Sequence, residues 1–154
     1  ASGIAPIRKL MAAGVPVSIG VDGAASNHAT HLLQEVRTAF LLARVREQSA
    51  DAITARETLE LATRGGAAVL GRDDIGYLAP GMSADFIAFN LDTPAFVGSH
   101  HDVAAALIFC QPPSVDYSFI NGRKVIDQGR LVTVQMEKLI ETCNHLASEL
   151  RQSI

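Results

Sequence analysis

The stretch VPVSIGVDGAASN, residues 15–27, decides the fold class. Its first seven residues are mostly apolar and rich in β-branched side chains, which is typical of a parallel strand buried on both faces. Asp22 follows directly, and the small and polar residues after it predict a loop. Helices are expected over residues 4–13 and 32–48, because apolar residues recur there at three- and four-residue spacing. The sequence therefore predicts an α/β fold.

A further helix is predicted to begin at Thr54. The Thr54–Glu57 spacing forms a capping box, in which each side chain satisfies a backbone donor at the start of the helix. The helix is expected to break near Gly65 and Gly66, and a further turn should end at Gly71.

After Gly71 the sequence changes to short β-like runs. An Asn-Gly pair at residues 121–122 separates two of these runs and predicts a hairpin, since both residue types tolerate positive φ. The expected elements are a strand over 84–90, a helix over 103–110, paired strands over 115–120 and 123–126, and an amphipathic helix over 135–150.

Composition narrows the class of protein. The chain has 154 residues, a net charge of −3, 48% hydrophobic and 5% aromatic residues, which suits a globular domain and argues against a nucleic-acid binder. No apolar run approaches the roughly 20 residues that cross a bilayer. The two cysteines, Cys110 and Cys143, make no disulfide framework, and we expect a cytoplasmic protein. The chain begins with neither Met nor a tag, so we expect it to be a piece of a longer protein.

Asp22 is the leading candidate for a catalytic or metal-binding residue. It stands at the carboxyl end of the predicted strand, where active sites of α/β proteins gather, and a carboxylate there can hold a cation or act as a base. An equally open interpretation is that Asp22 only hydrogen-bonds loop amides, as in an Asx turn. Glu35 is expected to be a solvated or interdomain salt-bridge residue, and the alternative is that it pairs with the neighbours of Arg37 or with the loop.

The histidines are weaker candidates than Asp22 for metal ligands. His28 and His31 lie three residues apart at the junction of loop and helix, but two histidines without a third ligand are more readily explained as helix caps, interchain contacts or residues at the mouth of a site. His100 and His101 are adjacent, so their side chains should diverge. Asp102 is expected to cap the helix that follows it.

Residues 14–27 resemble the last barrel strand of the metal-dependent amidohydrolase superfamily, in the branch of chlorohydrolases and of aminopurine or aminopyrimidine deaminases. Residues 35–42 are similar to the next helix of that branch, and residues 75–86 look like its return to a small β-sandwich. The stretch from His101 to Arg123 most resembles the C-terminal part of 8-oxoguanine deaminases. The resemblance covers nearly the whole chain.

The resemblance implies the C-terminal portion of a (β/α)8 TIM barrel, followed by the C-terminal strands of a β-sandwich and a terminal helix. The corresponding divisions are residues 1–71, 72–134 and 135–154. An N-terminal barrel segment would then be missing, and with it the histidine ligands and the glutamate of the family. The chain alone should therefore be inactive, and we expect a homo-oligomer or a companion segment to cover its open strand edge.

The resemblance also implies a site and a reaction. Asp22 corresponds to the metal-binding and proton-accepting aspartate of the family, with zinc or iron as the metal and a small heterocyclic amine as the substrate. The expected reaction is hydrolytic deamination of an aminopurine-like, 8-oxoguanine-type ring by metal-activated water. Ser26, Asn27 and His28 lie where the family shapes the mouth of the site. The alternatives are a dechlorinating or N-dealkylating hydrolase of s-triazines, and a non-catalytic assembly fragment.

Overall fold

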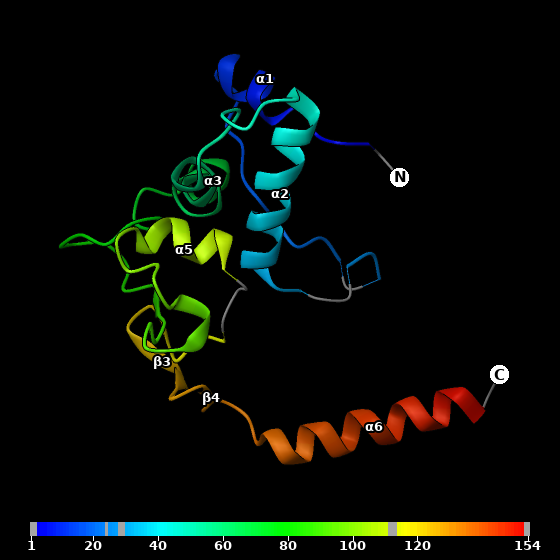
Figure 1. Cartoon of the computed structure of the whole chain (residues 1–154). Helices are drawn as coiled ribbons and strands as arrows, with labels where there is room; N and C mark the ends of the chain where they lie inside the picture. Colours follow the sequence, from blue (N-terminus) through cyan, green and yellow to red (C-terminus); the bar gives the residue numbers. More distant parts are fainter. Residues whose placement is uncertain (1–2, 24, 28–29, 111–113, 153–154) are drawn as a thin grey trace. The chain divides into compact units, whose positions relative to one another are not determined.

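The computed structural model describes residues 3–23, 25–27, 30–110 and 114–152, which form two compact units (Figure 1). Unit 1 consists of residues 1–83 and 91–113, and unit 2 consists of residues 84–90 and 114–154. The described part of unit 1 contains helices without a β-sheet, whereas unit 2 contains a sheet and the terminal helix. The protein is therefore a mixed α/β protein, as the sequence predicts.

Unit 1 is a group of packed helices connected by loops. Because α2 contacts both α3 and α5, and α3 contacts α4 and α5, these helices surround a common core. The elements of unit 1 are α1 (Ile7–Ala12), α2 (Leu32–Glu47), α3 (Ala55–Ala62), α4 (Arg64–Leu70), the short 3-10 helix η1 (Pro94–Phe96) and α5 (Val103–Phe109).

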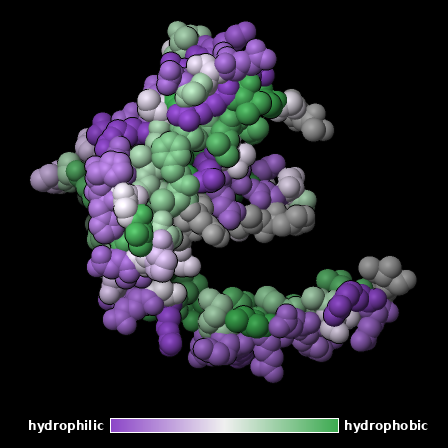
Figure 2. Space-filling model, viewed as in Figure 1, coloured by the Kyte–Doolittle hydropathy of each residue, from purple (hydrophilic) through white to green (hydrophobic). Residues whose placement is uncertain are grey.

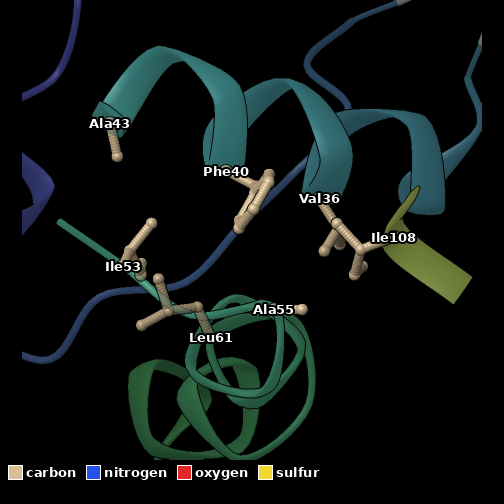
Figure 3. Close-up of a cluster of buried hydrophobic side chains, with 7 residues drawn as sticks. All are labelled: Val36, Phe40, Ala43, Ile53, Ala55, Leu61 and Ile108. Carbon is tan, nitrogen blue, oxygen red and sulfur yellow. The ribbon is translucent and has the colours of Figure 1, made fainter. Parts of the chain in front are cut away.

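The core of unit 1 lies along one side of α2. Val36, Phe40 and Ala43 recur at helical spacing, and their side chains point from α2 toward α3 and the segment before it (Figure 3). Full burial of a Phe or Val side chain contributes about 1.5–3 kcal/mol, so this side fixes α2 in the unit. The remaining members of the cluster are Ile53, Ala55, Leu61 and Ile108.

The predicted helix boundaries are largely confirmed. Thr54 Oγ1 accepts a hydrogen bond from the Glu57 amide at 3.1 Å, and Glu57 Oε2 accepts one from the Thr54 amide at 2.7 Å, so the capping box is present. α2 ends where Gln48 adopts a left-handed conformation, and α4 ends at Gly71, whose φ is +65°. Gly65 and Gly66, however, lie inside α4, and the break between α3 and α4 falls at Thr63.

The segment 15–21 differs from the predicted parallel strand. It adopts no regular secondary structure, because none of the described residues provides a neighbouring strand with which it could pair. Its burial nevertheless alternates: Val17 and Ile19 pack against the core of unit 1, whereas Ser18 and Gly20 between them are exposed. One side of the segment is therefore covered by helices, while the other side is open.

Unit 2 is built on a four-stranded antiparallel sheet in the order β1-β2-β3-β4. Asn121 and Gly122 both have positive φ and connect β2 to β3, which confirms the predicted hairpin. Phe86 of β1 stacks on Phe119 of β2, with ring centroids 4.6 Å apart. The strands are β1 (Phe86–Ala88), β2 (Tyr117–Ile120), β3 (Arg123–Asp127) and β4 (Arg130–Leu131).

The terminal helix α6 (Met136–Gln152) follows the sheet, as predicted. Figure 2 shows apolar residues along one side of α6 and polar residues along the other. Apolar side chains on this helix, among them Leu139, Ile140 and Leu146, are about half exposed. None of the described helices is both long enough and apolar enough to cross a membrane.

Candidate active site around Asp22

Asp22 lies directly after segment 15–21 with a left-handed backbone conformation, φ +61°. Aspartate tolerates this conformation better than most residues, because its short polar side chain can hydrogen-bond locally. Here Asp22 Oδ1 accepts a hydrogen bond from the Gly23 amide at 2.7 Å. The Asp22 side chain is otherwise exposed, so its second carboxylate oxygen is accessible to a ligand.

The loop after Asp22 is held by a small set of hydrogen bonds. The carbonyl oxygen of Gly23 accepts from the amides of Ser26 and Asn27, each at 2.9 Å. Asn27 Nδ2 donates to Glu35 Oε1 at 2.7 Å, which connects the loop to the first turn of α2. Of the partners considered for Glu35, the structure therefore shows the loop. The sequence analysis considered Asn27 and Glu35 separately but did not predict their hydrogen bond, because no sequence spacing predicts a contact between a loop residue and a helix residue eight positions later.

Both interpretations of Asp22 are compatible with this geometry. The bond to the Gly23 amide is a local loop hydrogen bond, although it reaches the next residue rather than the second one that defines an Asx turn. An exposed carboxylate also offers the lone pairs with which an oxygen binds a metal ion or accepts a proton. A catalytic zinc ion usually has three protein ligands besides water. Asp22 fits one of these positions by its chemistry, and the other ligands must come from elsewhere.

The histidines do not complete a metal site in the described part of the chain. Within residues 3–23, 25–27, 30–110 and 114–152, no three His, Cys, Asp or Glu side chains lie close enough together to hold a metal ion. His31 stands at the N-cap of α2 without a side-chain capping bond, and His28 lies outside the described residues. His100 Nε2 lies 3.2 Å from the carbonyl oxygen of Leu91, and His101 is exposed.

Asp102 has the structural role that the sequence predicts. Its Oδ1 accepts a hydrogen bond from the Ala105 amide at 3.1 Å and so caps α5. The same oxygen lies 3.1 Å from Arg56 Nη2, in an ion pair with α3. Asp102 thus stabilises the packing of α5 in unit 1.

Arg37 is a residue that the sequence reasoning missed. Its Nη1 donates to the carbonyl oxygens of Ile108, at 2.9 Å, and Phe109, at 2.6 Å, near the carboxyl end of α5. A cation is favourable there because the helix dipole is negative at that end. The partner residues are more than 70 positions away, so only the tertiary structure reveals the contact.

The comparisons with known proteins place the chain in a family. A sequence profile of the amidohydrolase family matches residues 1–125. The chain belongs to the amidohydrolase family, which confirms the resemblance carried by residues 14–27 and 75–86.

Two curated relatives illustrate the branch. The chain is 43% identical over 150 residues to an 8-oxoguanine deaminase of Pseudomonas aeruginosa, covering 97% of this chain and 33% of that protein. It is 38% identical to a 5-methylthioadenosine/S-adenosylhomocysteine deaminase of Pelotomaculum thermopropionicum, covering 97% and 35%. The chain therefore spans about a third of the length of the curated relatives that it matches.

Solved structures of related enzymes also match the chain. An adenosine deaminase from Xanthomonas campestris with bound zinc matches with a TM-score of 0.91 and 33% identity, over 98% of this chain and 35% of that one. The atrazine chlorohydrolase of Arthrobacter aurescens TC1, solved with zinc, matches with a TM-score of 0.86 and 35% identity, over 94% and 32%.

Proposed function

We propose that this chain is the C-terminal part of a metal-dependent hydrolase that deaminates an aminopurine-like heterocycle of the 8-oxoguanine type. The observation that carries the proposal is the exposed Asp22 carboxylate at the end of segment 15–21, in a chain that is 43% identical to an 8-oxoguanine deaminase. Residues 1–71 are proposed to form the last barrel strand and its flanking helices. Residues 72–134 are proposed to belong to the β-sandwich and residues 135–154 to the terminal helix.

Asp22 is proposed both to bind the metal and to move the proton. When bound, a divalent metal, zinc or iron, would lower the pKa of a water molecule far enough to supply hydroxide near neutral pH. Two of the matching structures were solved with zinc, which supports zinc as the metal of this proposal. Asp22 accepts the proton of the attacking water and passes it to the exocyclic nitrogen. A carbon–oxygen bond forms at the electron-poor ring carbon, the carbon–nitrogen bond breaks, and the nitrogen leaves as ammonia.

The remaining ligands are proposed to come from an N-terminal barrel segment, because the described residues supply no complete metal site. A parallel barrel strand has hydrogen-bonded neighbours along both edges, and none of the described residues forms a strand beside either edge of segment 15–21. Without that segment the chain is expected to be inactive. We further propose that the protein is cytoplasmic and that it assembles into a homo-oligomer.

Two other functions have specific support. The match to an atrazine chlorohydrolase favours an s-triazine hydrolase, in which chloride or an alkylamine replaces ammonia as the leaving group. The half-exposed apolar side chains of α6 favour a non-catalytic fragment that assembles with other chains. Both alternatives have the same fold as the proposed deaminase. The triazine hydrolase differs from it in the product released, and the assembly fragment differs in having no turnover.

The first experiment is the intact mass of the purified protein together with its metal content. The deaminase proposal expects a chain longer than 154 residues with about one zinc or iron per copy, and ammonia as the product. Metal-bound protein that releases chloride or an alkylamine instead would favour the triazine hydrolase. A metal-free oligomer that stays inactive after addition of the N-terminal segment would favour the assembly fragment.

Asp22→Asn is the variant that tests the role of the carboxylate. Asparagine tolerates the positive φ of Asp22, whereas alanine would add backbone strain of about 1–2 kcal/mol. We expect Asp22→Asn to retain the fold but to lose most of its bound metal. Asp73→Asn, which changes another exposed aspartate of unit 1, is the matched control and should keep the metal content of the wild type.

A further inference from the structure

Glu35 connects α2, which carries three residues of the core of unit 1, to the loop that carries Asp22. It lies in the first turn of α2 and is half-buried, and the next residue, Val36, is fully buried in the core. Because the core fixes this turn of α2, the position of the Glu35 carboxylate is also restricted. Its Oε1 accepts the hydrogen bond from Asn27 Nδ2 at 2.7 Å.

From Asn27 the contacts continue without interruption to the Asp22 carboxylate. The Asn27 amide donates to the carbonyl oxygen of Gly23 at 2.9 Å, and the Gly23 amide donates to Asp22 Oδ1 at 2.7 Å. A series of hydrogen bonds thus runs from α2 through the loop to Asp22. The described residues between 22 and 27 form no helix or strand, so hydrogen bonds of this kind restrain the loop.

We propose that Glu35 is a positioning residue, which sets the place and orientation of the Asp22 carboxylate through Asn27 and Gly23. The inference rests on the proposed function of Asp22. Groups that bind metal or substrate must be held within about 0.5 Å of the productive geometry, and residues behind the ligands usually supply that restraint. Glu35 need not touch metal or substrate to have this effect.

Three variants of the full-length protein test the proposal. Glu35→Ala removes the acceptor, Asn27→Ala removes the donor, and Glu35→Gln keeps an oxygen that can accept from Asn27. Gln34→Ala, at the neighbouring exposed position of α2, is the matched control. Metal affinity, kcat, KM and amide hydrogen exchange of a peptide over residues 20–27 are measured for each.

We expect Glu35→Ala and Asn27→Ala each to lower metal affinity or kcat by about 10- to 100-fold, the usual range for residues behind a metal ligand. KM should change less than kcat, because the reacting groups rather than the substrate pocket are displaced. Amide exchange over residues 20–27 should be faster in both. Glu35→Gln should retain most of the metal affinity, the kcat and the slow loop exchange of the wild type. The double variant Glu35→Ala/Asn27→Ala should be no worse than either single variant.

Equal metal affinity, kcat and loop exchange in Glu35→Ala and wild type would overturn the proposal. Equal losses in Glu35→Gln and Glu35→Ala would also overturn it, since charge rather than the hydrogen bond would then matter. If Glu35→Ala does not fold, Asn27→Ala tests the same bond from the loop. If the wild type itself binds no metal and releases no ammonia, the proposed function has failed, and unchanged exchange in Asn27→Ala would show separately that the restraint has failed.

Discussion

At the scale of single residues, backbone conformation determines which substitutions are informative. Asp22, Asn121 and Gln48 all have positive φ, a region that costs most side chains about 1–2 kcal/mol. Aspartate and asparagine are among the residues that enter this region most readily. Loss of function in Asp22→Asn would therefore report on the carboxylate, whereas Asp22→Ala would combine that loss with strain.

The stability of unit 1 should depend on pH through Asp74. Hydrogen bonds from Arg72 and then from Ser83 hold the pKa of Asp74 at about 2, below its ordinary value of 3.8. Because the folded-state pKa is depressed, the contribution of Asp74 to stability is present above pH 3.8 and is lost as the pH falls toward 2. We expect Asp74→Asn to be less stable than wild type at neutral pH and to show a flatter loss of stability between pH 4 and pH 2.

Denaturant unfolding at several pH values measures this effect. Asp73→Asn, at the adjacent exposed aspartate, should keep the steep acid dependence of the wild type. The same slope in Asp74→Asn and wild type between pH 4 and pH 2 would contradict the role of the Arg72–Asp74–Ser83 contacts.

The sequence predicted single residues best where the signal was local. Asp102 was predicted as a cap from the helix directly after it, and the cap is confirmed, whereas the role of Asp22 stays a prediction. Arg37 and the partner of Glu35 were not predicted, because their contacts depend on how loops and helices pack.

At the scale of elements, Gly65 marks a close approach of α4 to segment 15–21. A Cβ atom at Gly65 would overlap the carbonyl oxygen of Val17, which is backbone and has little freedom to move. The next residue, Gly66, has open space at the same point. Glycine at position 65 therefore permits the helix to pack against the segment that leads to Asp22.

This contrast predicts opposite effects for two adjacent substitutions. Gly65→Ala should destabilise the protein by about 1–3 kcal/mol, the usual cost of overpacking. Gly66→Ala should be neutral or stabilising by up to about 1 kcal/mol, because alanine is the better helix former. The free energy of unfolding from denaturant titration checks both, and a Gly65→Ala protein as stable as Gly66→Ala would contradict the close approach.

The elements that the sequence predicted correctly are those with their own termination signals. The capping box at Thr54, the Asn121-Gly122 turn and the end of α4 at Gly71 each depend on a few neighbouring residues. Segment 15–21 is different, because a parallel strand exists only when neighbours pair with it. Its apolar pattern predicted a strand buried on both faces, but only the side of Val17 and Ile19 packs on helices, and the described residues contain no strand beside it.

At the scale of the whole molecule, the proposed longer protein should supply the strands that pair with segment 15–21. The chain spans about a third of the length of its curated relatives, and the proposed barrel neighbours lie in the remainder. We expect the amides of residues 17–21 to exchange slowly with solvent in the full-length protein and quickly in the 154-residue chain alone. Hydrogen exchange followed by mass spectrometry measures this, and equally fast exchange in both would contradict a barrel strand at this position.

The central claim, that Asp22 carries the chemistry of a deaminase, is tested most directly by ammonia release from an 8-oxoguanine-type aminopurine. Full-length wild type, Asp22→Asn and Asp73→Asn are compared under the same conditions, with zinc in excess. We predict that wild type and Asp73→Asn release ammonia at similar rates, and that Asp22→Asn is slower by about 10²–10⁴-fold, the usual contribution of a positioned acid–base group. An Asp22→Asn protein as active as Asp73→Asn would contradict the account.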